Sequence, residues 1–128
     1  MQLEQLKRNC LALWRSQGMT ARLFHQITQV SGWQDWFGTP PPPPYEKWLR
    51  FFQCPNWRGV DFDFIWAHKN KQHRLIFWFE ASYPDWLFAV PDPPPVLFVM
   101  GQAAALSLPM LAIVGSRKAS TSAVMLSL

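Results

Sequence analysis

The segment of residues 110–117 constrains the fold of this chain more than any other. Five apolar residues run without a break into Gly115, Ser116 and Arg117. An apolar run of this length predicts a strand buried on both faces of a sheet. Gly115 would let the backbone turn sharply, and Ser116 and Arg117 would follow at the strand's carboxyl end, where open α/β sheets bind ligands. Because hydroxyl and guanidinium groups donate to phosphate, the segment predicts an anion site.

The amino-acid composition changes along the chain, which indicates two regions. The chain has 128 residues and twelve prolines, nine of them in the clusters at 40–44 and 91–95. All eight tryptophans lie between Trp14 and Trp86, and a hydrophobic content of 49% indicates a folded core. We therefore expect an α+β protein with a small helical domain over residues 1–80. The start of an incomplete α/β unit would follow over residues 81–128.

Two helices are predicted at the amino end. Gly18 would end a first, amphipathic helix. This helix is indicated by apolar residues at helical spacing: Leu3, Leu6, Cys10, Leu13 and Trp14. Thr20 is a candidate N-cap for a second helix, whose apolar side would be Leu23, Phe24, Ile27 and Val30. A structural helical hairpin is favoured over a DNA-binding helix-hairpin-helix unit. The DNA-binding unit needs a second glycine in the loop, and Met19 and Thr20 stand in its place.

The rest of the chain alternates proline runs with short elements. Residues 40–44 are predicted as extended polyproline II, serving as a spacer before a helix over 45–52 rather than as a ligand for a partner's groove. Residues 61–65 fit either a strand or a helix. Strands are predicted at 73–79 and 96–100, with a short helix starting at 83–87. How the strand at 96–100 pairs with the one at 110–114 stays open.

Charge, cysteine content and hydropathy limit the function classes. A net charge of +4 permits an anionic partner without requiring one. Cys10 and Cys54 form no CxxC motif and predict reduced thiols in the cytoplasm. A membrane span over residues 96–114 is not expected, because Pro109 and other breakers interrupt the uncharged stretch. No cofactor is expected.

Several polar groups have ordinary structural explanations. The basic run at 68–74 is expected to be a solvated loop, and zinc binding by His68 and His73 is disfavoured for want of further ligands. Asp61 and Asp63 are predicted to be solvent-exposed rather than a catalytic pair. The tryptophans are expected in the core rather than stacked on bases.

An ordered set of motifs resembles the DNA-processing protein A family, DprA/Smf. The motifs are Tyr83-Pro84, Asp92 to Phe98, Gly101, and Ile113 to Ser120. The resemblance is close from residue 83 to 121 and loose before residue 55. It implies a SAM-like domain at the amino end and entry into a Rossmann-like domain after it.

The resemblance implies a cytoplasmic DNA-binding protein rather than a conventional enzyme. Family members protect incoming single strands in natural transformation and help load the RecA recombinase. By this resemblance, Gly115, Ser116 and Arg117 match the loop that lines the family's single-strand pocket. Ser120 matches the motif's later serine, and Lys118 is adjacent. Single-stranded DNA and RecA are therefore the expected partners.

The chain departs from the family pattern after Thr121. The family continues with an aromatic residue, a glycine and a helix, whereas residues 122–128 read Ser-Ala-Val-Met-Leu-Ser-Leu. A truncated or frameshifted copy with weak or no activity is the expected explanation, lacking the other pocket residues and the family's homodimer surface. Two alternatives stay open: a fragment of a Rossmann-type nucleotide hydrolase, and a proline-rich interaction module.

Overall fold

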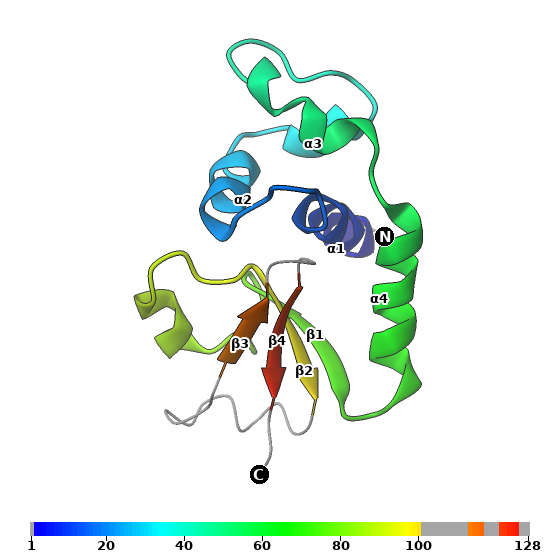
Figure 1. The fold of residues 1–128 in the computed structure, drawn as a ribbon, viewed down its shortest axis with the longest axis vertical. Helices are drawn as coiled ribbons and strands as arrows, with labels where there is room; N and C mark the ends of the chain where they lie inside the picture. The colour runs from blue at the N-terminus through cyan, green and yellow to red at the C-terminus, as the bar shows by residue number, and fades with distance from the viewer. Residues whose placement is uncertain (1, 101–112, 117–120, 126–128) are drawn as a thin grey trace.

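The computed structural model describes residues 2–100 and the backbone of 113–116 and 121–125 (Figure 1). Helices fill the first half of the chain and strands predominate in the second. In chain order the elements are α1 (Gln2–Trp14), α2 (Ala21–Thr28), η1 (Trp33–Phe37), η2 (Glu46–Trp48), α3 (Arg50–Gln53), α4 (Trp57–Lys69), β1 (His73–Phe77), η3 (Asp85–Ala89), β2 (Val96–Met100), β3 (Ile113–Ser116) and β4 (Thr121–Met125). The expected α+β class is confirmed, while the SAM-like and Rossmann-like arrangements stay predictions.

The two predicted amino-terminal helices are present. α1 buries its carboxyl-terminal half, and α2 buries Phe24 and Ile27. Thr20 caps α2 as predicted, since its Oγ1 accepts a hydrogen bond from the Leu23 amide at 3.1 Å. Gly18, in the connection between the helices, has a φ of +85°, which glycine adopts without a steric cost. Local spacing and a single cap thus account for this helical hairpin.

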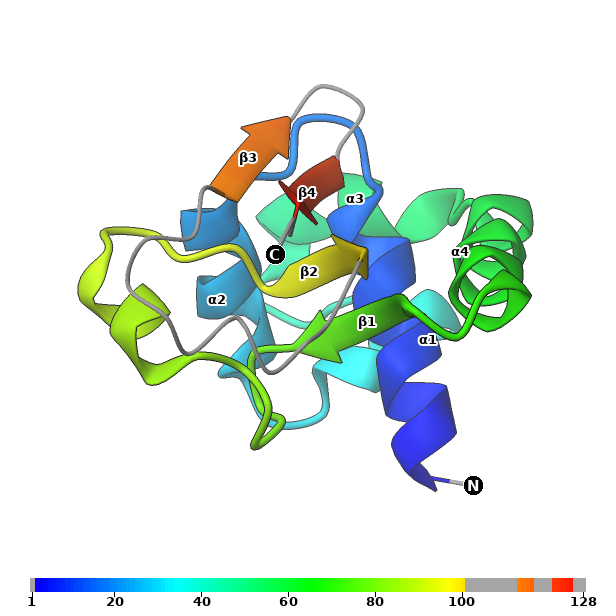
Figure 2. The same ribbon diagram turned by 90° about the horizontal axis from the view of Figure 1, so that it is seen from below.

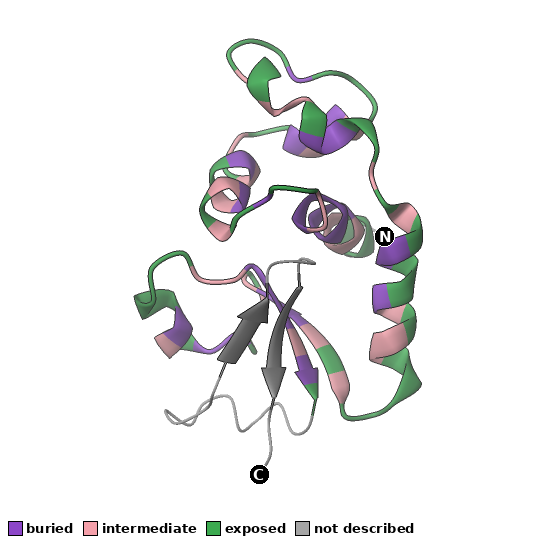
Figure 3. Ribbon diagram, in the orientation of Figure 1, coloured by how far each residue is buried: buried purple, intermediate pink, exposed green. Residues whose placement is uncertain are grey.

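The segment around residues 61–65, which fits either element by sequence, is helical. It lies in α4, whose N-cap Asn56 accepts a hydrogen bond from the Gly59 amide at 2.9 Å. α4 turns Gly59, Val60 and Asp63 inward and leaves Phe62 and Ile65 exposed. Its outer face therefore carries these two apolar side chains among charged and polar ones. The exposed stripe is visible along α4 in Figure 3.

The first proline run departs from its prediction at its carboxyl end. The Tyr45 amide donates to the Pro42 carbonyl at 2.7 Å, which closes a turn over Pro43 and Pro44. Extended polyproline II therefore does not continue to residue 44. The helix predicted over 45–52 is divided into the short helices η2 and α3.

Four strands form one mixed sheet in the order β1-β2-β4-β3. β1 pairs antiparallel with β2, β2 pairs parallel with β4, and β4 pairs antiparallel with β3. The strands at 96–100 and 113–116 are therefore not neighbours, because β4 lies between them. The helix that the family pattern places after the glycine–serine–arginine motif is replaced here by β4, because Thr121–Met125 pairs with both neighbouring strands.

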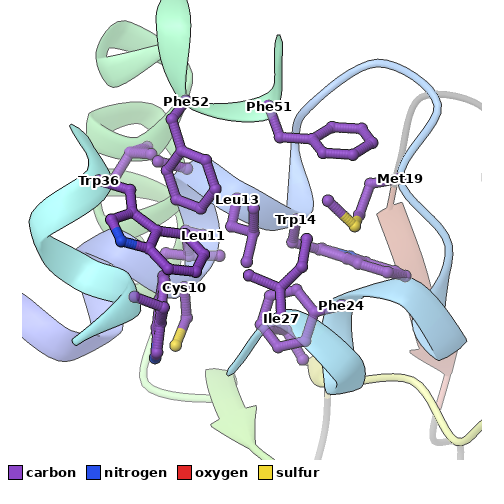
Figure 4. Close-up of a cluster of buried hydrophobic side chains, with 14 of the residues drawn as sticks. Cys10, Leu11, Leu13, Trp14, Met19, Phe24, Ile27, Trp36, Phe51 and Phe52 are labelled. Atoms are coloured by element: carbon purple, nitrogen blue, oxygen red, sulfur yellow. The ribbon is translucent and has the colours of Figure 1, made fainter. Parts of the chain in front are cut away.

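Both faces of the sheet are buried where β1 ends and β2 begins, which explains the continuous apolar sequence of β2. Phe77 and Val96, opposite each other, pack into the helical core with α1 and α2. Figure 4 shows that core around Trp14, Phe24 and Ile27. On the other face, Ile76 and Leu97 pack beneath Tyr83 and Leu87 of the η3 region; Val99 completes this second cluster.

The core and the sheet extend across residues 80 and 81, since β1 pairs with β2 and Val96 packs with the helices. The division of the chain at that point stays a prediction. Within the part of the chain that the structure describes, no helix has the length and apolar character to cross a membrane.

Candidate nucleic-acid interface

The predicted anion site lies at the end of β3. Gly115 is inside this strand, opposite Ser122, and Ser116 is its last residue, opposite Thr121. The sharp turn predicted at Gly115 is therefore wrong, because the glycine is extended and paired within the sheet. Ser116 does lie at the strand's carboxyl end as predicted. Arg117, Lys118 and Ser120 fall outside the described residues.

The register fixes which end of the sheet Ser116 occupies. Ala123 of β4 lies opposite Phe98 of β2, so Thr121 is level with Val96, where β2 begins. Val96 lies opposite Phe77, where β1 ends. Ser116 is therefore at the same end of the sheet as the β1 terminus, and β3 points from the sheet toward α1 and α2 (Figure 1).

Two pieces of the motif set that precede β2 contact each other. The Tyr83 hydroxyl donates to the Pro94 carbonyl at 2.6 Å, and the Tyr83 side chain is 3% exposed. Burial raises the pKa of this phenol above its ordinary value, which keeps the donor protonated. Tyr83 thereby holds the second proline cluster at the entrance to β2.

The described basic side chains fall into two groups. Four are paired with carboxylates, at 2.7–3.2 Å: Lys7 with Glu80, Arg8 with Asp61, Arg15 with Asp63, and Arg22 with Asp92. Within the described chain, the others have no carboxylate within 4.0 Å: Lys47, Arg50, Arg58, Lys69, Lys71 and Arg74. The second group supplies exposed positive charge.

The basic run does not join the anion site. Lys69, Lys71 and Arg74 are exposed between α4 and the start of β1. His73 lies opposite Met100, at the end of the β1–β2 pair that is remote from Val96 and therefore from Ser116. The predicted solvated loop is limited to residues 70–72, at the far end of the sheet, because residues 68–69 end α4 and residues 73–74 begin β1.

Asp63 corrects one sequence expectation, since it is 5% exposed rather than solvated. Its two oxygens accept hydrogen bonds from Arg15 Nε at 2.9 Å and Nη2 at 2.7 Å. These hydrogen bonds raise the pKa of the Arg15 guanidinium above its ordinary value. Asp61 is exposed as predicted and pairs with Arg8. The two carboxylates are therefore structural partners of arginines that connect α1 to α4.

Neither histidine of the basic run is arranged as a metal ligand. His68 Nδ1 lies 2.8 Å from the Phe64 carbonyl, and His73 Nδ1 lies 2.8 Å from the Trp66 carbonyl. The His73 ring also stacks on Trp66, with centroids 4.2 Å apart. Across the described ranges, no group of three or more His, Cys, Asp or Glu residues could hold a metal ion.

The structure shows a cleft that the sequence prediction missed. A cavity of about 460 Å³ lies between the polar face of α2 and residues 88–93, with Trp78 in its lining. From α2 it is lined by Arg22, His25, Gln26 and Gln29. These polar residues recur at helical spacing opposite the apolar side of α2, which is the sequence signal that would have indicated this face. We call this cavity the α2 groove.

The comparisons with known proteins agree with the motif set. Residues 74–127 match the family model of DNA recombination-mediator protein A. The match includes the glycine–serine–arginine motif and the described strands, apart from His73 at the start of β1. No curated protein and no solved structure matches the chain. This match supports a DNA-processing role in recombination. Over residues 74–127, the chain is therefore similar to the DNA recombination-mediator protein A family, in agreement with its DprA-like motifs.

Proposed function

We propose that this protein binds single-stranded DNA through the residues that follow β3. Ser116 and Arg117 would donate to a phosphate, Gly115 would leave room for the backbone, and Lys118 and Ser120 would add contacts. The protein would act as a binding protein rather than an enzyme and would help RecA load onto the strand.

The observation that supports this proposal is the family match over residues 74–127, which contains the whole motif. β3 ends at Ser116, so this residue lies at a strand terminus, where open α/β sheets bind ligands. Among the described carboxylates, Asp61 and Asp63 are each occupied by an arginine, which argues against a catalytic pair there.

Binding through these residues alone would be weak and salt-sensitive. A protein that makes roughly six to ten phosphate contacts loses about 10³–10⁵ in affinity between low and moderate salt. Arg117 and Lys118 would provide one or two such contacts. We therefore expect measurable binding at low salt and little at physiological salt.

The test is fluorescence anisotropy of a labelled oligothymidine at several salt concentrations. Arg117→Ala should weaken binding severalfold and reduce the salt slope by about one. The matched control is Arg58→Ala, which removes the same charge from an exposed site on α4. Equal effects of the two variants would show that only net charge matters and would refute the assignment of Arg117.

RecA loading is tested separately, by following RecA ATPase on single strands coated with a binding protein. Addition of this protein should shorten the lag, and Arg117→Ala should restore it. A panel of nucleoside triphosphates incubated with the protein alone should show no hydrolysis. Hydrolysis abolished by Arg117→Ala would instead support the nucleotide-hydrolase alternative.

A further inference from the structure

Side-chain contacts join the two walls of the α2 groove. Arg22 on α2 makes two hydrogen bonds to Asp92, at 3.2 and 3.3 Å. One turn along, His25 Nε2 lies 3.0 Å from the Pro93 carbonyl. These contacts connect α2 to the segment of residues 92–93, and the cavity is present without a ligand.

The lining combines aromatic rings with free amide groups. Trp78 is half-buried and packs edge-to-face against Phe24, with centroids 5.3 Å apart and an interplanar angle of 89°. Phe88, on the opposite wall, is 49% exposed. Gln26 and Gln29 are exposed in the groove, and neither side chain has a hydrogen-bond partner among the residues that the structure describes.

This combination fits an unpaired nucleobase. A base offers a flat π-face for Trp78 or Phe88 and an edge of mixed donors and acceptors. Each glutamine amide supplies one acceptor and two donors, so it can pair with such an edge. The only carboxylate in the lining, Asp92, is neutralised by Arg22, and so it does not repel a phosphodiester strand.

The groove also lies at the correct end of the sheet for a strand bound at the predicted anion site. The Trp78 amide donates to the Pro95 carbonyl at 2.9 Å, directly beyond the Phe77–Val96 pair. Ser116 is level with that pair, three strand positions away across the sheet. Since neighbouring strands are about 4.8 Å apart, the lateral offset is about 14 Å. That distance spans about four nucleotides at a stacked spacing of ~3.4 Å.

Building on the single-strand binding proposed above, we propose that the α2 groove is a base-binding subsite. It accepts one unpaired base of the strand whose phosphates are held after Ser116. Trp78 and Phe88 provide the stacking surface, and Gln26 and Gln29 bond the base edge. Because a glutamine amide can pair with either a donor or an acceptor on the base edge, the subsite is weakly selective among the bases.

The test compares an oligothymidine with an oligomer of the same length that carries abasic sugars, by fluorescence anisotropy. The groove variants are Phe88→Ala and the double variant Gln26→Ala/Gln29→Ala. Matched controls are Phe62→Ala on α4 and the double variant Gln53→Ala/Gln72→Ala, which remove the same groups from other exposed sites. All these side chains are exposed, so the fold should tolerate their loss.

We expect each groove variant to weaken oligothymidine binding by about fivefold. This factor corresponds to about 1 kcal/mol, the lower end of the binding free energy that one stacked base contributes. The same variants should leave binding of the abasic oligomer unchanged, and the controls should match the wild type with both ligands. The side-chain amide resonances of Gln26 and Gln29 should shift on addition of the oligothymidine. Thymidine monophosphate should shift them too, at higher concentration, because a free nucleotide offers the same base.

The outcomes separate this proposal from the one on which it depends. If Arg117→Ala weakens binding but the groove variants do not, the base-binding subsite is refuted and single-strand binding stands. If no oligomer binds and no nucleotide shifts the amide resonances, both proposals fail. If a proline-rich peptide shifts those resonances and nucleotides do not, the groove is a peptide site and the proposal is overturned.

Discussion

Gly59 occupies the tightest position that a glycine holds in the described chain. A Cβ at this residue would lie 2.7 Å from Arg15 Nη1, 2.8 Å from Arg15 Cζ and 2.7 Å from Asn56 Nδ2. Asn56 is exposed, and its side-chain oxygen accepts the hydrogen bond from the Gly59 amide that caps α4. The Arg15 guanidinium is also restrained, because two hydrogen bonds attach it to the buried Asp63.

We therefore predict that Gly59→Ala destabilises the protein, against the usual trend in helices. Replacing glycine by alanine in a helix interior normally gains about 1 kcal/mol. Here the new methyl group must displace Arg15, and breaking a buried ion pair by losing one partner costs about 3–5 kcal/mol. If Arg15 shifts without leaving Asp63, only part of that cost applies. The expected net loss is about 2 kcal/mol in the free energy of unfolding.

Equilibrium urea unfolding followed by circular dichroism measures this change, with the m-value expected to stay constant. The matched control is Gly38→Ala, since a Cβ there would contact only the Asp35 carbonyl, at an ordinary 3.9 Å. It should change stability by less than about 0.5 kcal/mol. A Gly59→Ala variant as stable as the wild type, or more so, would refute the close packing of α1 against α4.

Three further changes test local features of the fold. Cys54 should react with a thiol reagent in the native protein, while Cys10 should not, since burial raises the pKa of its thiol and blocks access. Thr20→Ala should cost about 1 kcal/mol by removing the cap of α2. Tyr83→Phe should cost about 1 kcal/mol at neutral pH by removing the donor to Pro94. Because the pKa of Tyr83 is raised, its neutral form stabilises the fold below pH 10.0, and that stability is lost as the pH rises further.

Each of these has a contradicting result. Two thiols reacting at equal rates before unfolding would contradict the burial of Cys10. For Thr20, the control is Thr39→Ala, an exposed threonine whose hydroxyl makes no hydrogen bond in the described structure; equal losses would refute the cap. For Tyr83, alkaline unfolding should be shallower in the phenylalanine variant, and identical pH profiles would show that the phenol is not buried.

Features that depend on neighbours along the chain were predictable from the sequence. The apolar spacing of α1 and α2 and the threonine cap each lie within one or two helical turns. The strand at 96–100 was predictable as well, because a continuous apolar run is needed where a sheet is covered on both faces. The family motifs, placed at residues 83–121 from the sequence, likewise fall within the matched residues 74–127.

Partners from distant parts of the chain decided the rest. From the sequence, Asp63 is predicted to be solvent-exposed. In the structure, the packing of α4 against α1 brings it to Arg15, which is 48 residues away in the sequence. The same packing leaves Phe62 and Ile65 exposed although both are apolar. They lie on the face of α4 opposite Val60 and Asp63, which face the rest of the protein.

The α2 groove and the position of β4 have the same origin. α2 presents a polar stripe in its sequence, but only the contacts from Arg22 to Asp92 and from His25 to Pro93 make it the wall of a cavity. β4 has an apolar sequence suited to a strand, and its place between β2 and β3 depends on hydrogen bonds to both. Sequence thus determined which segments are helix or strand where local contacts dominate. Tertiary structure determined which residues meet, since such pairings form only when the whole chain has packed.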